Sequence, residues 1–393
     1  MKKIAAICTV YYKYSHAQHI VDRFLESYGY AGKYYRPERC RVVSLYVDQF
    51  PENDLSRERS ERFGVPIYPT IAEALTLGGE RLAVDGVLLI GEHGNYPTNE
   101  KGQRLYPRYR FFKETEAVFR ESGRSVPVFN DKHLSYDWSQ AVEMVEVSRE
   151  LGFPFMAGSS LPVTWRIPAL EFPLGVRLRE AVCVCYGGVD SYDFHGLETI
   201  QCMVERREGG EVGVRSLQAV RGEAFWEALR EGRWDQELMW AAIARSFTRR
   251  PAREGRLDFD PRTDRLEEVV PDPIAYVMEY SDGLRATMML LNRFVEDFNF
   301  AARLEDGSIA SCQMYLPMPP RRTTLASFFT PLCQAIERMF LTGKPTYPVE
   351  RTLLTTGQTY FGVESLHRGG ERLETPELAV SYRPPEESFF WRQ

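Results

Sequence analysis

Histidine and carboxylate side chains follow several apolar runs of this 393-residue chain. Glu92 and His93 follow the run VDGVLLI, and Asp131 and His133 follow VPVFN. Imidazole nitrogens and carboxylate oxygens are ligands for divalent metals, so these residues and His195 would form a metal site if the ends of the runs converge. Their spacing along the chain does not indicate such a site, and the alternative is that they lie in loops packed against the next helix.

The stretch ICTVYYKYSHAQHIVDRFL, residues 7–25, is typical of a strand that leads into a helix. Ser15 and Gln18 form a capping box, after which apolar residues recur at helical spacing. In many α/β proteins such a turn holds a phosphate, and glycine lets the backbone N–H groups approach it. Here the first glycine of the chain is Gly29, and the turn consists of Tyr11, Tyr12, Lys13 and Tyr14.

Two interpretations of this glycine-free turn are open. The helix start near Ser15, together with Lys13, could still hold an anion through backbone N–H groups and the helix dipole. Alternatively, the aromatic side chains fill the channel and prevent a dinucleotide from binding. His16 and His19 stand three residues apart at the same helix start. They could bind a metal ion or a phosphate, or lie at the surface near the cap.

Apolar runs and amphipathic stretches alternate through the first part of the chain. We expect strands at RVVSLYVDQF, VDGVLLIGEHG and VPVFNDKH, and helices at DLSRERSERFGV, RYRFFKETEAVFRESG and WSQAVEMVEVSRELG. This alternation implies right-handed crossovers and an α/β fold, with a doubly wound, Rossmann-like parallel sheet over residues 1–157. A ligand site is expected beyond the carboxyl ends of its strands.

Longer strand-like segments replace the alternation after residue 157. AVCVCYGGVDSYDFHGLETIQCMVERR, VGVRSLQAVRG and two hairpins with turns at Ser281-Asp282-Gly283 and Asp306-Gly307 predict a largely antiparallel open sheet. A helical insert, AFWEALREGRWDQELMWAAIARSF, lies between them, and two helical stretches end the chain. We therefore expect residues 158–393 to form an α+β domain whose C-terminal helices pack back. One face of such a sheet often packs against a partner, so we expect a homo-oligomer, either a dimer or a tetramer.

Composition argues against several functional classes. The 49 basic and 55 acidic residues give a net charge of −6 and are mixed along the chain, which argues against a nucleic-acid surface. No run approaches the ~20 apolar residues needed to span a bilayer, so no membrane partner is expected. The seven cysteines, an odd number without a C-x-x-C pair, fit reduced, buried thiols and a cytoplasmic location.

Several motifs, taken in order, resemble the glucose-fructose oxidoreductase and inositol dehydrogenase family of sugar oxidoreductases. They are ERFGVPIYPTIAEAL, VDGVLLIGEHG, VPVFNDKHLSYDW, GVDSYDFHGLETIQ and, near the end, GKPTYPVERTLLTTGQTYFGVESLHRGG. The resemblance implies a Rossmann-like domain followed by a substrate domain, with NAD or NADP as cofactor and a sugar or polyol as substrate. The chain is a divergent example, because Asp131 and His133 replace the Glu and Pro of the family's E-K-P motif.

The resemblance also implies roles for individual residues. Lys132 corresponds to the family's lysine that bridges substrate and nicotinamide, and His195 corresponds to the histidine that exchanges a hydroxyl proton. Ser191 replaces the family's aspartate four residues before that histidine, which leaves Asp190 or Asp193 as the partner of His195. The catalytic candidates are therefore Lys132, His195 and Asp193.

Further candidates would bind the cofactor or the substrate. Asp48 closes a predicted strand and corresponds to the acidic residue that accepts hydrogen bonds from an adenosine ribose. The other cofactor-binding candidates are Tyr11, Ser15, His16, Glu92, His93 and Asp131. Trp165 could stack on a sugar face, and Arg166 could fix a hydroxyl or carboxylate group. The remaining substrate-binding candidates are Ser160, Asp190 and Tyr192.

Three functional hypotheses follow. The first is NAD(P)-dependent oxidation of a sugar or polyol, with His195 taking the hydroxyl proton. The second is elimination, hydration or isomerisation of a sugar or keto-sugar without a dinucleotide, with or without a metal ion. The third is a non-catalytic sugar-binding protein or scaffold. Both enzymatic hypotheses require Lys132 and His195 to face each other across one crevice.

Overall fold

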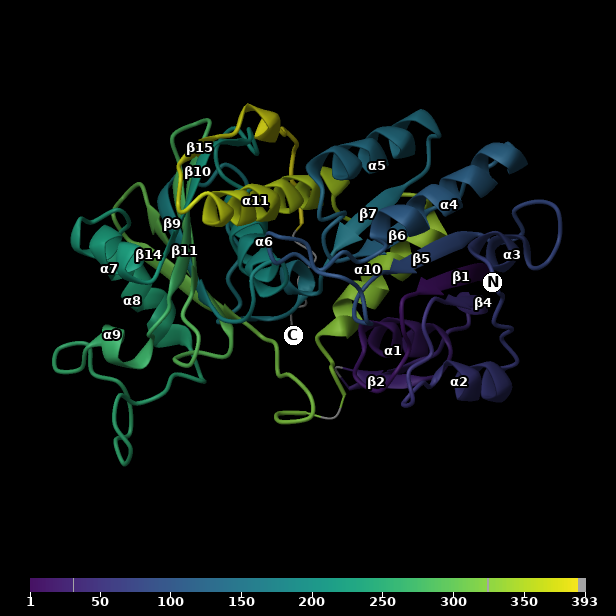
Figure 1. The fold of residues 1–393 in the computed structure, drawn as a ribbon, viewed down its shortest axis with the longest axis horizontal. Coiled ribbons are helices and arrows are strands. Elements are labelled where there is room, and N and C mark those ends of the chain that lie inside the picture. The colour runs from purple at the N-terminus through teal and green to yellow at the C-terminus, as the bar shows by residue number, and fades with distance from the viewer. Residues whose placement is uncertain (31, 324, 388–393) are drawn as a thin grey trace.

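Two large sheets organise the chain and lie toward opposite ends of its longest axis (Figure 1). The computed structural model describes residues 1–30, 32–323 and 325–387. The predicted fold class is confirmed: a Rossmann-like parallel sheet is followed by an α+β part with a largely antiparallel sheet.

The first sheet is parallel throughout, in the order β4-β1-β5-β6-β7. Its strands are β1 (Lys2–Cys8), β4 (Cys40–Val47), β5 (Gly86–Ile90), β6 (Val128–Asp131) and β7 (Phe155–Gly158). Every residue of β5, β6 and β7 is buried, because helices cover both faces of the sheet. The elements between the strands are α1 (His16–Val21), η1 (Asp22–Phe24), the hairpin β2 (Tyr28–Tyr30) and β3 (Lys33–Tyr35), α2 (Ser56–Phe63), α3 (Ile71–Thr76), α4 (Arg108–Ser122) and α5 (Trp138–Glu150).

A helix from the last third of the chain completes one face of this sheet. Leu332 and Ile336 of α10 (Phe329–Thr342) share a buried cluster with Ile4 and Ala6 of β1. The helix α10 thus belongs to the core of the first sheet. The domain boundary after residue 157 stays a prediction, because α10 belongs to the core of the first sheet.

The second sheet has the order β15-β10-β11-β12-β9-β13-β14-β8, and its neighbours are antiparallel except for the central pair β12 and β9. Its strands are β8 (Arg166–Ile167), β9 (Leu178–Cys185), β10 (Val214–Arg221), β11 (Ile274–Tyr280), β12 (Arg285–Leu290), β13 (Phe298–Leu304), β14 (Ile309–Met314) and β15 (Leu373–Glu374). The predicted turns at 281–283 and 306–307 join β11 to β12 and β13 to β14, as expected.

Helices cover both faces of the second sheet. One buried cluster joins the sheet to α6 (Tyr192–Val204) and α11 (Val349–His367). Another joins the opposite face to α7 (Glu223–Arg230), α8 (Gln236–Arg245) and the start of α9 (Leu266–Val269). Short 3-10 helices, η2 (Leu161–Val163) and η3 (Pro376–Leu378), complete the fold. None of the helices in the described ranges has both the length and the apolar character required to cross a bilayer.

The helix α6 corrects one prediction. The sequence after Cys185 was expected to continue as a strand, but the strand ends there and residues 192–204 are helical. Every residue from Asp193 to Val204 is buried. A helix surrounded by protein has no polar face, so its sequence does not display the helical period.

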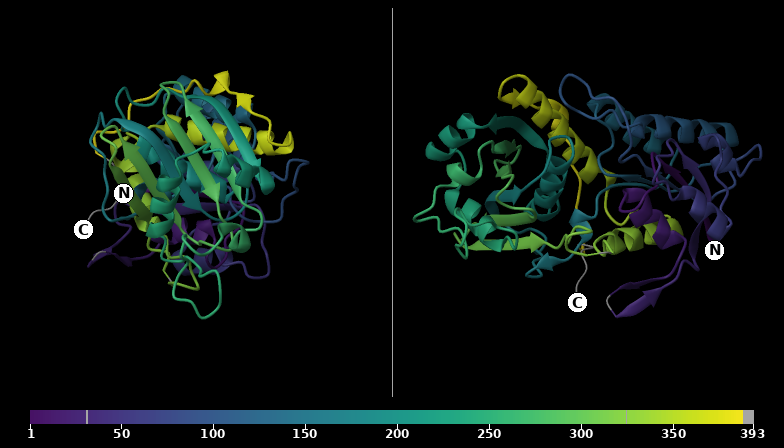
Figure 2. Two further views of the ribbon diagram at one scale, coloured as in Figure 1. Left: turned by 90° about the vertical axis from the view of Figure 1, so that its left-hand side faces the viewer. Right: turned by 60° about the horizontal axis from the view of Figure 1, so that its bottom comes forward.

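The long helix α11 links the two sheets. It contacts α5 and β7 of the first part and α6 and β10 of the second. Figure 2 shows α11, in yellow, running from the second sheet toward the first. Its contact with both parts fixes the position of α6 relative to the carboxyl ends of β6 and β7.

Candidate active site

A cavity of about 230 Å³ lies where the carboxyl ends of β5, β6 and β7 meet the start of α6. This is the edge where a ligand site was expected. Its lining comes from the first turn and α1 (Tyr14, His16, His19), from residues after β5, β6 and β7 (Glu92, His93, Tyr106, Lys132, Ser159, Ser160, Leu161), from the start of α6 (Ser191, Tyr192, His195), and from the segment that leads into α10 (Leu316, Met318, Phe328, Phe329).

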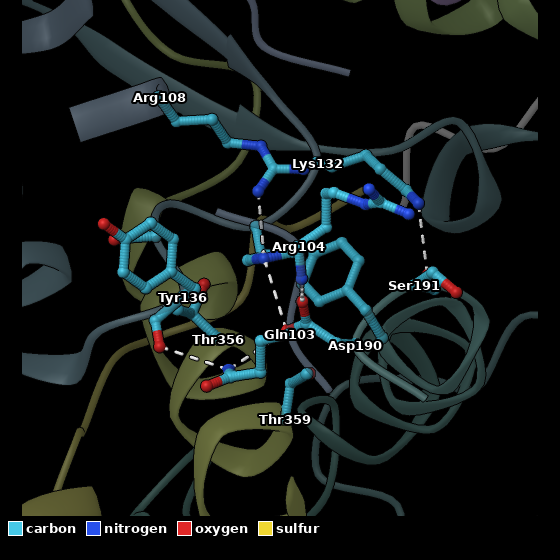
Figure 3. A network of polar contacts seen from close by, with 12 residues as sticks. Gln103, Arg104, Arg108, Lys132, Tyr136, Asp190, Ser191, Thr356 and Thr359 are labelled. Carbon is cyan, nitrogen blue, oxygen red and sulfur yellow. Dashed lines mark hydrogen bonds and ion pairs between the residues drawn. The ribbon is translucent and has the colours of Figure 1, made fainter. Parts of the chain in front are cut away.

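Lys132 connects the two parts of the chain across this cavity. It follows β6 with a φ of 64°, and its side chain is only 3% exposed. Its Nζ donates a hydrogen bond of 3.1 Å to the carbonyl oxygen of Ser191 (Figure 3) and lies 3.6 Å from Oε2 of Glu92. An ammonium group held in this way can stabilise negative charge that develops on a substrate oxygen.

His195 lines the same cavity from α6, so the expected crevice shared by Lys132 and His195 is present. Its Nδ1 lies 3.0 Å from Oγ of Ser159 and 3.4 Å from Oε2 of Glu198. Burial, together with the charge of Lys132, lowers the pKa of His195 well below its ordinary value. The imidazole is therefore neutral at pH 7 and can accept a proton.

Glu198 is a site residue that the sequence-based candidates lack. Its Oε1 accepts a hydrogen bond of 2.9 Å from the backbone N–H of Ser159, and its Oε2 accepts one from the Ser159 hydroxyl. Burial raises the pKa of Glu198 to about 7, although these hydrogen bonds favour the charged form. His195 and Glu198 are three residues apart, a spacing that brings side chains together only on a helix. Because no helix was predicted there, the contact between His195 and Glu198 was not predicted either.

Asp193, a predicted catalytic residue, lies outside the cavity. It is fully buried at the start of α6, where its carboxylate accepts hydrogen bonds from the Tyr276 hydroxyl and from the backbone N–H groups of Asp190, Ser191 and Phe194. The bond from Phe194 satisfies an N–H group that the first turn of a helix leaves without a partner, and the other two backbone bonds hold the residues just before the helix. The structure therefore corrects the expectation that Asp193 orients His195, and assigns it to the helix start.

Asp190, predicted to bind substrate, also lies outside the described lining of the cavity. Its carboxylate accepts hydrogen bonds of 3.2 Å from Nε2 of Gln103 and from the backbone N–H of Arg104 (Figure 3). Burial and the neighbouring Asp193 raise the pKa of Asp190 to about 7. Asp190 thus anchors the loop after β5 to the start of α6.

The other substrate-binding candidates divide between the cavity and the core. Ser160 and Tyr192 line the cavity, as predicted. Trp165 stacks on Tyr30 with ring centroids 5.1 Å apart, and Arg166 is buried and donates to the carbonyl oxygen of Leu170 at 3.0 Å. Trp165 and Arg166 are not among the described residues that line the cavity, so the structure does not place them at a sugar.

The candidates around β5 and β6 form a connected polar group. Nδ1 of His16 lies 2.6 Å from Oδ2 of the fully buried Asp131. Glu92 accepts a hydrogen bond from Arg108, and Nη1 of Arg108 lies 3.0 Å from Nε2 of His133. The cavity is lined by His16, Glu92 and His93. The described residues that line it do not include Asp131 or His133. Burial would raise the pKa of Glu92, but the charges of Lys132 and Arg108 lower it overall.

The first turn does not form a phosphate-binding loop. Tyr11 is fully buried and donates a hydrogen bond to Asp22. The hydroxyl of Ser15 accepts a hydrogen bond of 3.2 Å from the backbone N–H of Gln18, and α1 is only six residues long. Tyr14 has a φ of 70°, the left-handed conformation that glycine adopts most easily. Tyr11 and Ser15 therefore stabilise the turn itself, and neither is part of the described lining of the cavity.

Asp48 does not offer its carboxylate to a ribose. It accepts hydrogen bonds of 2.7 Å from the hydroxyls of Tyr46 and Tyr96, and another from Arg110. The backbone N–H of Leu55 donates to the carbonyl oxygen of Tyr11 at 2.7 Å, which joins the first turn to the segment after β4. The carboxylate at the edge that would hold an adenosine is thus engaged by the chain's own groups. The residues present do not fit a dinucleotide there.

Backbone strain concentrates around the cavity. Tyr14, His93 and Lys132 line it with φ values of 70°, 67° and 64°, and Asp190, with a φ of 60°, precedes Ser191 of the lining. Residues other than glycine rarely adopt this conformation, which costs about 1–2 kcal/mol each. Strain of this kind is maintained where the surrounding structure holds side chains for a function.

Solved structures with a similar fold include GenD2 and two inositol dehydrogenases. GenD2 from gentamicin A biosynthesis, in complex with NAD, is 12% identical with a TM-score of 0.58, covering 95% of this chain and 96% of that chain. A myo-inositol dehydrogenase from Corynebacterium glutamicum is 12% identical with a TM-score of 0.53 and coverages of 95% and 98%. A myo-inositol dehydrogenase from Lactobacillus casei, in complex with NAD(H) and myo-inositol, is 10% identical with a TM-score of 0.55 and coverages of 95% and 96%.

These likenesses establish a shared fold over nearly the whole chain, and they support the family resemblance at the level of the fold. No protein-family model matches the sequence, and no curated protein sequence matches it.

Proposed function

We propose that this chain is an enzyme that transfers protons on a small sugar or keto-sugar, on the scaffold of a sugar dehydrogenase and without a bound dinucleotide. The observation that carries the proposal is the single cavity that Lys132 and His195 line together. A neutral imidazole and an ammonium group are a base and a stabiliser of negative oxygen, which are the two groups that proton abstraction beside a carbonyl requires.

His195 makes two proton transfers in this reaction. Ser159 and Glu198 hold Nδ1 of His195, so Nε2 takes the proton from the carbon next to the substrate carbonyl. The C–H electron pair moves into an enolate, and Lys132 stabilises its oxygen. In an isomerisation, His195 returns the proton to the former carbonyl carbon, and the proton of the neighbouring hydroxyl passes to the enolate oxygen, so the carbonyl group moves by one carbon. In an elimination, the enolate expels the hydroxyl of the next carbon, which takes the proton from His195 and departs as water while a carbon–carbon double bond forms.

The size and lining of the cavity support a sugar-sized substrate. Its volume of about 230 Å³ is below the ~300–1,000 Å³ of pockets for drug-sized ligands. Tyr106 and Tyr192 offer rings, and Ser160 offers a hydroxyl. A structural neighbour from Lactobacillus casei is described in complex with myo-inositol, a polyol of this size class.

NAD(P)-dependent oxidation of a sugar or polyol is the second candidate function. The fold supports it, because two of the similar structures are described as complexes with NAD or NAD(H). The engaged carboxylate of Asp48 and the buried Tyr11 favour the first candidate, because both side chains already make hydrogen bonds within the protein.

Hydrogen exchange separates active from inactive variants. In D₂O, proton NMR of a panel of ketoses, aldoses and sugar acids should show deuterium entering the carbon next to the carbonyl of at least one compound. His195→Asn and Lys132→Met are each expected to slow this exchange by about 10²–10⁴-fold. His367→Ala, at the far end of α11, is the matched histidine control and should leave the rate unchanged. Full activity of both cavity variants would contradict the proposal.

A thermal-shift titration with NAD⁺ and NADP⁺ decides between the two candidates. We expect no shift at millimolar dinucleotide. Saturable binding together with hydride transfer to the nicotinamide would replace the first candidate by the second.

A further inference from the structure

Three side chains on the α1 side of the cavity place ligand atoms close together. His16, Glu92 and His93 each contribute one nitrogen or oxygen atom, and these atoms all lie within 4.8 Å of one another. The rings of His16 and His93 are 5.2 Å apart between centroids and nearly perpendicular, at 73°. The proton transfers described above use none of these three residues.

The imidazole of His16 is oriented by a buried carboxylate. Its Nδ1 lies 2.6 Å from Oδ2 of Asp131, which is 0% exposed. A carboxylate in this position fixes the proton on Nδ1 and leaves the lone pair of Nε2 available. Histidines that bind metals are generally held in this way, with the second nitrogen donating to a carboxylate or carbonyl group.

His93 has a buried nitrogen without a partner. Its Nε2 is inaccessible to solvent and makes no hydrogen bond with the residues that the structure describes. The residue is held at a φ of 67°, which costs free energy to maintain. A buried nitrogen of this kind loses its hydration unless something binds it, and a metal ion would bind it.

Glu92 retains a carboxylate oxygen for a ligand. Arg108 donates to its Oε1, whereas Oε2 lies 3.6 Å from Nζ of Lys132, beyond hydrogen-bond distance. The negative charges of Glu92 and Asp131 balance the positive charges of Lys132 and Arg108. A divalent ion would therefore add net positive charge to the cavity, which favours an anionic oxygen as its remaining ligand.

We propose that His16, Glu92 and His93 bind a divalent transition-metal ion, with Zn²⁺ as the best match. Two imidazoles and one carboxylate are a ligand set of catalytic zinc sites, in which the fourth position stays open for water or substrate. The open position would face the cavity that Lys132 and His195 also line. This site deepens the proposed function, on which its catalytic role rests, because the ion would polarise the substrate carbonyl beside Lys132.

Zinc titration of the full chain tests the site directly. After treatment with a chelator, isothermal titration with Zn²⁺ should show one ion bound per chain. His16→Ala and His93→Ala should each weaken binding by about 100-fold or more, and Asp131→Asn by about 10–100-fold through loss of the orienting carboxylate. His19→Ala, a histidine on the same helix that lines the same cavity, is the matched control and should bind as the unmodified chain does.

A second measurement needs no variant. Loading the unmodified chain with Co²⁺ should give the visible absorption of a four-coordinate cobalt site, and Zn²⁺ should displace it. Absence of stoichiometric Zn²⁺ binding, or unchanged binding by both His16→Ala and His93→Ala, would overturn the metal site. Deuterium exchange that survives chelation but not His195→Asn would leave the proposed function standing without the metal. If the chain binds the metal ion but His195→Asn still exchanges deuterium at the full rate, the metal site stands and the proposed function falls.

Discussion

At the scale of single residues, the proposed chemistry depends on a neutral histidine, His195, whose Nδ1 is held by neighbouring side chains. His195 is buried beside Lys132, which keeps its pKa low, and Ser159 and Glu198 contact its Nδ1. Glu198 is itself buried, and its pKa is raised to about 7. The carboxyl of Glu198 therefore changes charge near neutral pH, directly behind the proposed base.

Glu198→Gln is expected to remove part of the pH dependence of stability. The folded-state pKa of Glu198, about 7, exceeds the ~4.3 of a free glutamate, so the folded chain binds this proton more tightly than the unfolded chain. The contribution to the free energy of unfolding is full below about pH 4 and is lost as pH rises toward 7, by at most about 1.4 kcal/mol per pH unit. Urea unfolding at roughly pH 5 and pH 7 should show a smaller loss in the variant than in the unmodified chain. Equal losses would contradict the prediction.

At the scale of elements, α6 carries most of the second part's contribution to the site. Its N-cap Ser191 and its first-turn residues Tyr192 and His195 line the cavity, and Glu198 of the next turn contacts Nδ1 of His195. The first N–H groups of this buried helix have acceptors: Tyr192 and Asp193 donate to the carbonyl oxygen of Gly188, and Phe194 donates to the carboxylate of Asp193. Asp193, a residue predicted to be catalytic, thus holds the start of the helix that carries His195, the proposed base.

Asp193→Ala should therefore act on stability rather than on chemistry alone. It would leave three backbone N–H groups and the buried Tyr276 hydroxyl without their acceptor. We expect the free energy of unfolding to fall by about 2–4 kcal/mol in urea unfolding experiments. Tyr276→Phe, which removes only one of these hydrogen bonds, should cost about 1 kcal/mol. A fully stable Asp193→Ala variant would argue against the capping role.

The sequence predicts short apolar runs that alternate with amphipathic helices, and it predicts the turns between strands. The alternation before residue 157 and the turns at 281–283 and 306–307 led to the correct sheets. The sequence does not reveal the helix α6, because a helix buried on every side has no polar stripe. Lys132 and His195 were found through motif resemblance, whereas Glu198 required knowledge of the helix. Trp165 and Arg166 were misplaced because sequence does not tell which way a side chain points.

At the scale of the whole molecule, close packing along α11 holds the two parts together. Gly357 lies where a Cβ would come within 2.2 Å of Leu378 and 2.7 Å of Trp138, and at Gly362 a Cβ would come within 2.3 Å of the Tyr276 ring. Because Tyr276 also donates to Asp193, the fit of α11 is transmitted to the start of α6.

Gly362→Ala should destabilise the chain, although glycine-to-alanine changes usually stabilise helix interiors by about 1 kcal/mol. The added methyl group would overlap Tyr276, and we expect a net loss of about 1–3 kcal/mol, as for other overpacked cores. Thermal or urea unfolding measures this loss. A stabilised variant would show that α11 can move away from the sheet without a loss in the free energy of unfolding.

The sequence predicts a homo-oligomer that packs through an open face of the second sheet. The subunits would have to contact each other through another surface, because that face is already covered. Helices α7 and α8 of the same chain cover that face, with Phe225, Trp234 and Leu238 packed against Val182 and Val184 of β9. Light scattering coupled to size-exclusion chromatography should report the mass of a dimer or tetramer if the proposal holds. A mass near the 45.4 kDa of one chain would contradict it.

The contact of α11 with α5 and β7 on one side and with α6 and β10 on the other has a consequence for access. Many two-part enzymes admit their ligands by swinging apart about a hinge, but here such a swing would have to break or bend a helix embedded in both parts. Ligand entry is instead expected to depend on small movements of side chains that line the cavity. The rate of entry would then follow the movement of a few side chains.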